Sequence, residues 1–240
     1  SMIGFTNQQD VGQEGVELAY DSWLDGKPEQ VRVVRDAVGK SIETLSLIER
    51  GEEGKRLHLT LDRRLQFLAY RSLNRALKEF DAESGTVVVL DSDRSEILAM
   101  VSLPSFNPND LAQRKGGALR NRAVTDLLEP GSTMKPFTVA AAMENGIVTT
   151  STTIDTSPGT LRVGRKTIRE FRNHNYKEVN MARLLQKSSN VGSAMVALMM
   201  KPQQFWRVLD LAGIGEETGS TFPGEGTGVL RDYARWRKVE

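Results

Sequence analysis

The sequence predicts an α/β fold of the α+β type, in which an antiparallel sheet is packed by helices and preceded by a small irregular module. Residues 60–80 carry apolar side chains at steps of three and four, which predicts an amphipathic helix. Residues 86–102 contain two strand-like runs joined by a short turn, and helical patterns return after residue 132. Because a short turn can join only antiparallel neighbours, we expect an antiparallel sheet.

Composition places the chain among water-soluble globular proteins. Of its 240 residues, 39% are hydrophobic and 26% are charged. The 32 Lys and Arg nearly balance the 31 Asp and Glu, and a net charge of +1 gives no sequence-wide reason to expect nucleic acid as a partner. The absence of cysteine excludes disulfides, thiolate metal sites and a cysteine nucleophile, and two distant histidines make a multi-histidine metal site unexpected. No apolar run is long enough to span a bilayer.

Residues 1–55 are predicted to form the small N-terminal module. Apolar positions recur at roughly helical spacing over residues 16–24. Residues 31–34 and 41–47 are predicted to be short strands on either side of a turn. The charged, glycine-punctuated stretch 50–56 is typical of a linker, so the module is expected to end there.

Residues 56–240 are predicted to form the main domain, which opens with a helix and a hairpin. Thr60 or Asp62 can cap the helix. The antiparallel strands of the hairpin are expected at 86–90 and 96–102, and the β-branched run of the first is typical of a buried strand. The apolar stripe of the helix consists of Leu65, Leu68, Ala69, Leu73, Ala76, Leu77 and Phe80.

The rest of the main domain is predicted to be mainly helical. A helix should begin near Ser132 and end near Asn145, where Gly146 supplies a left-handed C-cap. Residues 149–164 are rich in Thr, Ser, Gly and Pro and should be mostly loop and short strand. Further helices are expected at 181–187, 191–200 and 202–213.

A serine and a lysine three residues apart form the first candidate catalytic motif. Ser132 and Lys135 lie at the start of a predicted helix, so their side chains share one face. A serine hydroxyl becomes a good nucleophile once a base takes its proton, and a partly desolvated lysine can be that base. The positive end of the helix favours the developing alkoxide, and the Ser132 amide is a possible oxyanion donor. The alternative is that this spacing arises by chance, so that Ser132 is only a helix cap and Lys135 is a solvated surface residue.

The second candidate motif is Ser188-Ser189-Asn190, which lies between two predicted helices. Ser188 could relay a proton between Lys135 and a leaving amine. Asn190 offers both a donor and an acceptor, so it could hold the lysine and a substrate amide. The alternative is that Ser189 or Asn190 simply caps the next helix. The candidate catalytic residues are therefore Ser132, Lys135, Ser188 and Asn190.

In this order and context, the motifs resemble the transpeptidase domain of penicillin-binding proteins, whose signature combines S-x-x-K, S-x-N and K-T-G. The similarity extends to residues 85–110, with their GTVVVLD and EILAM strands and PSFNPN loop, and to residues 121–123 and 222–225. Residues 4–7 and 12–17 resemble the module before the catalytic domain in class B, monofunctional members. The N-terminal piece and the Ser-Ser-Asn form are most similar to the division-specific, septal type.

The resemblance implies a penicillin-binding-protein transpeptidase fold, with part of a non-catalytic pedestal at 1–55 and the N-terminal part of the transpeptidase domain at 56–240. It implies a peptidoglycan D,D-transpeptidase in which Ser132 attacks the D-alanyl-D-alanine end of a stem peptide and the acyl group passes to an amine of a neighbouring stem.

The resemblance also implies partners and a location. The implied partners are peptidoglycan stem peptides, β-lactam antibiotics that acylate the same serine, a septal glycosyltransferase and other division proteins; no nucleic acid, metal or organic cofactor is implied. The implied location is the bacterial inner membrane, with a single N-terminal anchor outside these 240 residues and a periplasmic catalytic domain.

The third family motif, K-[ST]-G, does not occur in the 240 residues, since neither Gly39-Lys40-Ser41 nor Lys187-Ser188-Ser189 supplies it. We therefore expect the front part of a catalytic domain, barely reactive with β-lactams and prone to aggregate or to pair through open sheet edges. Two alternatives remain. One is another serine acyl enzyme, a β-lactamase or a β-lactam sensor, although residues 191–217 lack the E-x-x-L-N stretch of class A β-lactamases. The other is a non-catalytic scaffold or docking module.

Overall fold

The computed structural model describes residues 2–236 and divides the chain into two compact units. Unit 1 comprises residues 1–126 and 219–226, and unit 2 comprises residues 127–218 and 227–240. The predicted domains, 1–55 and 56–240, begin and end in residues outside the described part, and their boundary after residue 55 stays a prediction. The described strands form five two-stranded antiparallel sheets accompanied by helices, which confirms the predicted α+β class.

The N-terminal part of unit 1 contains two antiparallel hairpins, which pair β1 with β2 and β3 with β4. The second hairpin confirms the strands predicted at 31–34 and 41–47. The four strands are β1 (Phe5–Thr6), β2 (Gly12–Glu14), β3 (Gln30–Arg35) and β4 (Ser41–Glu49).

The helical spacing of apolar residues over 16–24 corresponds to two short helices in the structure. α1 (Gly15–Ala19) ends and α2 (Asp21–Leu24) begins at Tyr20, whose φ of −119° and ψ of 21° are not helical. The predicted helical pattern is thus present, although the spacing of apolar residues over so short a stretch does not reveal that the helix is interrupted at one residue.

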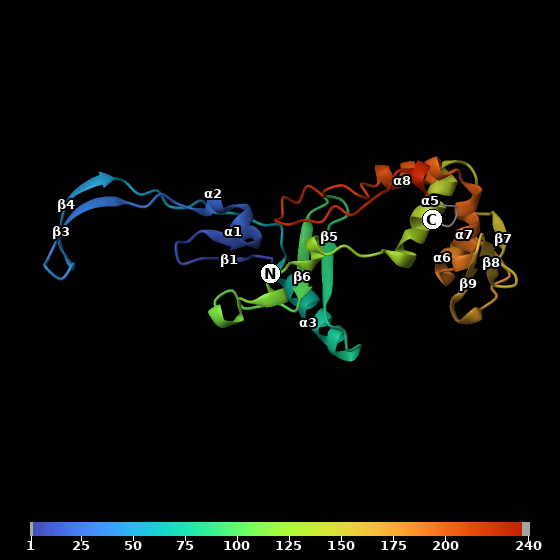
Figure 1. Cartoon of the computed structure of the whole chain (residues 1–240), viewed down its shortest axis with the longest axis horizontal. Coiled ribbons are helices and arrows are strands. Elements are labelled where there is room, and N and C mark those ends of the chain that lie inside the picture. Colours follow the sequence, from blue (N-terminus) through green and yellow to red (C-terminus); the bar gives the residue numbers. More distant parts are fainter. Residues whose placement is uncertain (1, 237–240) are drawn as a thin grey trace. The chain divides into compact units, whose positions relative to one another are not determined.

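The core of unit 1 is a helix packed on a hairpin (Figure 1). α3 (Arg63–Glu79) begins after Asp62, whose carboxylate accepts hydrogen bonds from the N–H groups two and three residues later, at 2.7 and 2.9 Å. The predicted cap is thus confirmed. The helix packs against β5 (Gly85–Leu90) and β6 (Ile97–Leu103), the predicted antiparallel hairpin. The helix side chains in this core are Leu65, Ala69, Leu73 and Leu77.

Two expectations about burial in this core are wrong. Leu68 and Phe80, assigned to the apolar stripe, are 49% and 75% exposed, because the contact line of the helix follows steps of four. β5 alternates between half-buried and exposed positions, with Val88 and Leu90 exposed, whereas its β-branched run is typical of a buried strand. An antiparallel hairpin that receives a helix on one face leaves the other face accessible.

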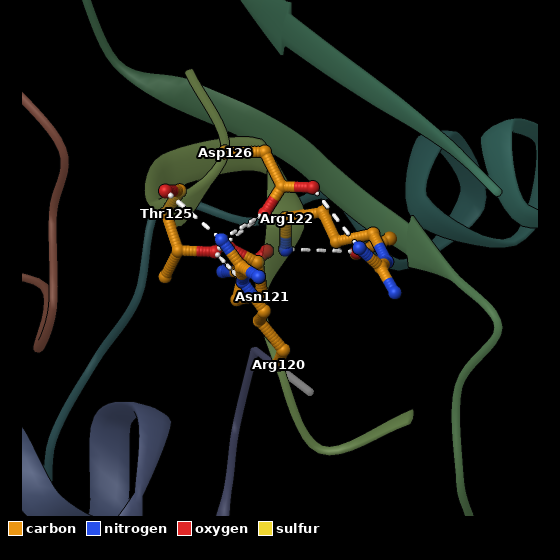
Figure 2. Close-up of polar contacts among 6 residues, drawn as sticks. Arg120, Asn121, Arg122, Thr125 and Asp126 are labelled. Atoms are coloured by element: carbon orange, nitrogen blue, oxygen red, sulfur yellow. Dashed lines mark hydrogen bonds and ion pairs between the residues drawn. The ribbon is translucent and has the colours of Figure 1, made fainter. Parts of the chain in front are cut away.

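A polar cluster connects the short helix α4 (Arg122–Thr125) to β6 (Figure 2). The Asp126 carboxylate forms ion pairs with Arg120 and Arg122 at 2.7 and 3.0 Å. The backbone N–H of Arg122 donates to Ser102 Oγ on β6 at 3.0 Å. Desolvation raises the pKa of Asp126, but the hydrogen bond from Arg122 and the charges of both arginines outweigh it and hold that pKa below its ordinary value.

Unit 2 gathers helices around a separate apolar core, in which Leu184 and Val196 are fully buried. The predicted helices are confirmed, although the first one opens with a 3₁₀ turn. No helix within residues 2–236 combines the length and the apolar character needed to cross a bilayer. The helical elements are the 3₁₀ turn η3 (Gly131–Met134), α5 (Lys135–Glu144), α6 (Met181–Lys187), α7 (Asn190–Met199) and α8 (Pro202–Leu211).

Short strands accompany these helices (Figure 1). β7 (Thr153–Asp155) pairs with β10 (Glu178–Asn180), and β8 (Thr160–Val163) pairs with β9 (Lys166–Arg169). β9 and β10 were not predicted from the sequence. The contact between β9 and α7 matters for the site, because it carries the residue after β9 to the start of α7. Further 3₁₀ turns span Leu111–Gln113, Gly116–Ala118, Phe171–Asn173 and Tyr233–Arg235.

Candidate active site

The first motif lies where a 3₁₀ turn leads into a helix. Ser132 lies in η3 and Lys135 is the first residue of α5, close to the predicted helix start. Gly131 opens the turn with a φ of +57°, and a Cβ there would meet nothing within 4 Å. Glycine is therefore favoured at this position by its backbone conformation and not by space. Pro136 fits the first turn of the helix, where its missing N–H has no helical partner to lose.

The second motif connects α6 to α7. Ser188 ends α6 in the left-handed conformation, with φ 51° and ψ 46°, which is uncommon for a residue with a side chain. Ser189 caps α7, since its Oγ accepts a hydrogen bond from the Gly192 N–H at 2.9 Å. Ser189 is fully buried, whereas Ser188 is exposed. Ser189, the middle residue of the connection, therefore has a structural role as a helix cap, while the side chains of Ser188 and Asn190 are available for contacts outside α7.

Lys135 joins the two motifs. Its Nζ donates to the backbone carbonyl of Ser188 at 2.5 Å, to Ser188 Oγ at 2.9 Å and to Asn190 Oδ1 at 2.7 Å. Three acceptors match the three protons of an ammonium group, so the amine is held in a defined position. The contact between Nζ and Ser188 Oγ is the one that a proton relay through this hydroxyl requires.

The surroundings of Lys135 favour loss of its proton. Partial burial lowers the pKa of Lys135 below its ordinary value, because desolvation disfavours the ammonium form. The negative charge of Glu170 acts in the opposite direction but does not cancel the effect. A lowered pKa increases the fraction of neutral amine, which is the form that can accept a proton from a serine hydroxyl.

Ser132 shares the helix terminus with Lys135, but no hydrogen bond joins their side chains. It is exposed, and its Oγ has no hydrogen-bond partner among residues 2–236. The convergence of Ser188 and Asn190 is on Lys135. The catalytic roles assigned to these four residues stay predictions.

A buried carboxylate beside the second motif was missed by the sequence reasoning. Glu170 directly follows β9 and is 3% exposed. Its Oε1 accepts hydrogen bonds from Ser189 Oγ and from the Val191 N–H at 3.2 Å, and its Oε2 accepts one from the Asn190 N–H at 2.8 Å. These partners lie 19 to 21 residues further along the chain, so no local pattern marks the glutamate. Recognition of β9 as a strand was the one available signal.

Comparison with known protein families identifies the chain. A family model described as the penicillin-binding protein transpeptidase domain matches residues 85–240, and one described as the penicillin-binding protein dimerisation domain matches residues 2–59. The chain therefore belongs to the penicillin-binding protein transpeptidase family.

Individual relatives agree with this assignment. The chain is 39% identical over 231 residues to a probable peptidoglycan D,D-transpeptidase, PenA, of Neisseria flavescens. The aligned residues make up 95% of this chain and 57% of that protein. The chain is 38% identical over 239 residues to the peptidoglycan D,D-transpeptidase FtsI of Escherichia coli K12, with 100% and 40% covered. A solved apo structure of the transpeptidase domain of Burkholderia pseudomallei penicillin-binding protein 3 matches with a TM-score of 0.66 and 32% identity, over 75% of this chain and 50% of that one. The chain thus spans about half the length of the relatives it matches.

Proposed function

We propose that the protein is a peptidoglycan D,D-transpeptidase that acts by serine acyl transfer. The observation that carries this proposal is the set of hydrogen bonds from Lys135 Nζ to Ser188 and Asn190, at the helix terminus that also bears Ser132. In the proposed acylation, neutral Lys135 takes the Ser132 proton while Oγ attacks the carbonyl carbon of the penultimate D-alanine. The bond to the terminal D-alanine breaks, and Ser188 passes a proton from Lys135 to the departing amine.

The second half of the reaction reverses these proton transfers. An amine of a neighbouring stem peptide attacks the acyl ester, loses a proton to Lys135 by way of Ser188, and forms the cross-linking amide. Ser132 leaves as the alcohol after it regains its proton. A β-lactam acylates Ser132 in the same way, but its leaving nitrogen stays tethered to the acyl group by the opened ring.

Asn190 is proposed to hold the lysine and the substrate together. Its Oδ1 accepts from Lys135, and its Nδ2 donates to the backbone carbonyl of Arg169 at 2.9 Å. An amide nitrogen carries two protons, so one remains for a substrate carbonyl. This division of roles requires the amide, and an aspartate of the same shape has no proton to offer.

We further propose the septal role in cell division. Similarity of residues 4–7 and 12–17 to the module of class B members, the Ser-Ser-Asn motif and relatives that carry the names FtsI and PenA support it. The proposed partners are then a septal glycosyltransferase and other division proteins. The proposed location is the bacterial inner membrane, with an N-terminal anchor and a periplasmic catalytic domain.

The test uses the full-length product of the gene. It is incubated with a stem peptide that ends in D-alanyl-D-alanine and with an acceptor peptide that has a free amine, and mass spectrometry follows D-alanine release and cross-linked product. We expect both products, suppression by penicillin, loss of both in Ser132→Ala, and no change in Ser151→Ala, an exposed serine of the same unit. Rapid hydrolysis of penicillin indicates a β-lactamase, and absence of any reaction favours a scaffold; either result contradicts the proposal.

A further inference from the structure

Glu170 is a buried acid that the proposed reaction does not use. A carboxylate with 3% exposure is costly to desolvate unless hydrogen bonds replace its water. All three donors to its side chain come from the Ser188–Asn190 connection and the first turn of α7. The hydrogen bonds of the Glu170 side chain therefore all go to one segment, which contains the candidate catalytic residues Ser188 and Asn190.

The two carboxylate oxygens of Glu170 accept hydrogen bonds from different donors. Oε2 takes the N–H of Asn190, while Oε1 takes the N–H of Val191 and the hydroxyl of Ser189. Both N–H groups belong to the start of α7, where no preceding carbonyl of the helix is available to them. A carboxylate at a helix N-terminus is also favoured by the helix dipole. Glu170, the residue directly after β9, thus caps the start of α7 from a different part of unit 2.

The contacts of Glu170 bear on the position of the groups that accept hydrogen bonds from Lys135. Asn190 is fixed from both sides, through its backbone N–H by Glu170 and through its Nδ2 by the carbonyl of Arg169. Ser188 directly precedes the capped residues and ends α6 in the left-handed conformation, which is uncommon for a residue with a side chain. Ser188 offers its backbone carbonyl and its Oγ to Lys135 from this position.

We propose that Glu170 is a positioning residue, which holds Ser188 and Asn190 in the arrangement that receives the Lys135 amine. The inference rests on the proposed transpeptidase function for its kinetic consequence. Its structural content, the anchoring of the connection between α6 and α7, does not depend on that function.

The test compares Glu170→Gln with the unchanged full-length protein and with Glu178→Gln, which alters an exposed acid of β10 in the same unit. Glutamine keeps the size of the side chain but replaces one acceptor oxygen with a donor, so one N–H of α7 faces an N–H₂ group. Stopped-flow acylation by a penicillin separates the dissociation constant of the initial complex from the acylation rate constant. For Glu170→Gln we expect a loss of about tenfold to a hundredfold in the rate constant, with little change in the dissociation constant. Glu178→Gln should match the unchanged protein.

Hydrogen exchange of peptides that cover residues 188–193 is measured on the same proteins, because this readout needs no activity. Exchange should accelerate in Glu170→Gln and not in Glu178→Gln. Ser189→Ala, which removes one donor and keeps Glu170, should show a smaller loss of the rate constant; it carries the test if Glu170→Gln does not fold.

The outcomes separate the two proposals. Unchanged acylation and unchanged exchange in Glu170→Gln overturn the positioning role. A loss confined to the dissociation constant, or an equal loss in Glu178→Gln, also overturns it. If the unchanged protein does not react with penicillin at all, the proposed function fails, while faster exchange in Glu170→Gln still supports the anchoring of the turn.

Discussion

The cluster around Asp126 in unit 1 and the cluster around Lys135 in unit 2 both join basic side chains to oxygen acceptors, but they draw their members from the chain in different ways. Asp126 pairs with Arg120 and Arg122, residues of the same turn (Figure 2). Lys135 contacts Ser188 and Asn190, which lie 53 and 55 residues further along.

Where the members of a cluster come from determines what that cluster contributes. Ion pairs between partly exposed neighbours form once the local turn forms, and solvent screens them, so they contribute little to stability. The Lys135 cluster exists only when α5, α6 and α7 are packed on their shared core. The entropy cost of ordering these groups is therefore met when the protein folds and not during the reaction, as catalysis by preorganised groups requires. Substitutions near Lys135 should change chemistry, and substitutions near Asp126 should change only stability.

Removal of the lysine amine should give the largest effect in this comparison. In Lys135→Ala we expect acylation of the full-length protein by penicillin to fall by about a thousandfold, since the proposed general base is lost. The melting temperature should change little, because Lys135 is only partly buried and is not a member of the apolar core. Lys187→Ala, which alters an exposed lysine at the end of α6, is the control and should acylate normally. Equal rates for Lys135→Ala and the control would exclude Lys135 as the base.

Gly192→Ala should affect both the stability of the protein and its rate of acylation, because Gly192 packs tightly against the connection between α6 and α7. A Cβ at this position would lie 2.9 Å from Ser189 Oγ and 3.0 Å from Leu184 Cδ1. We expect overpacking to cost about 1–3 kcal/mol of unfolding free energy, more than the gain in helix propensity, and to slow acylation by displacing Ser189. Denaturant unfolding and penicillin acylation measure the two effects. A variant more stable than the unchanged protein would show that the turn is not tightly packed.

The pH dependence of acylation should report the lowered pKa of Lys135. The neutral amine is the reactive form, so the rate constant should rise with pH through the pKa of Lys135 and level off above it. Because burial lowers this pKa, the midpoint should lie below that of an ordinary lysine. Rate constants for penicillin acylation across a pH series at constant ionic strength give the midpoint. A midpoint at or above the ordinary lysine value contradicts the desolvated environment.

Asp126→Asn should give the smallest effect. The pKa of Asp126 is depressed in the folded protein, so its stabilising contribution is present above the unfolded pKa and is lost as pH falls through the folded pKa. Thermal melting at neutral pH and low salt should show a slight destabilisation that disappears in acid and in high salt, while acylation is unchanged. A loss of acylation comparable to that of Lys135→Ala would break the contrast between the two clusters.

The same contrast explains how much the sequence could predict. The helix capped by Asp62, the hairpin of β5 and β6 and the helices on either side of Ser188 were predictable, because each shows its periodicity within its own residues. The exposure of Val88 was not, because it depends on which face α3 covers.

The candidate site divides in the same way. The spacing of Ser132 and Lys135 and the Ser188–Asn190 turn could be read directly, and the family signature joined them. Glu170 could not be found, because its hydrogen bonds depend on β9 reaching the start of α7. The residues of β9 can indicate a strand, but they do not indicate which helix that strand contacts.

The most direct test of the proposed chemistry is the site of covalent modification. The full-length protein and its Ser132→Ala variant are incubated with a penicillin, digested, and the acylated peptide is identified by tandem mass spectrometry. We predict one penicilloyl group per protein, attached to Ser132, and no adduct in the variant. An adduct that persists in Ser132→Ala, or that maps to another serine in the unchanged protein, would contradict the assignment of Ser132 as the nucleophile.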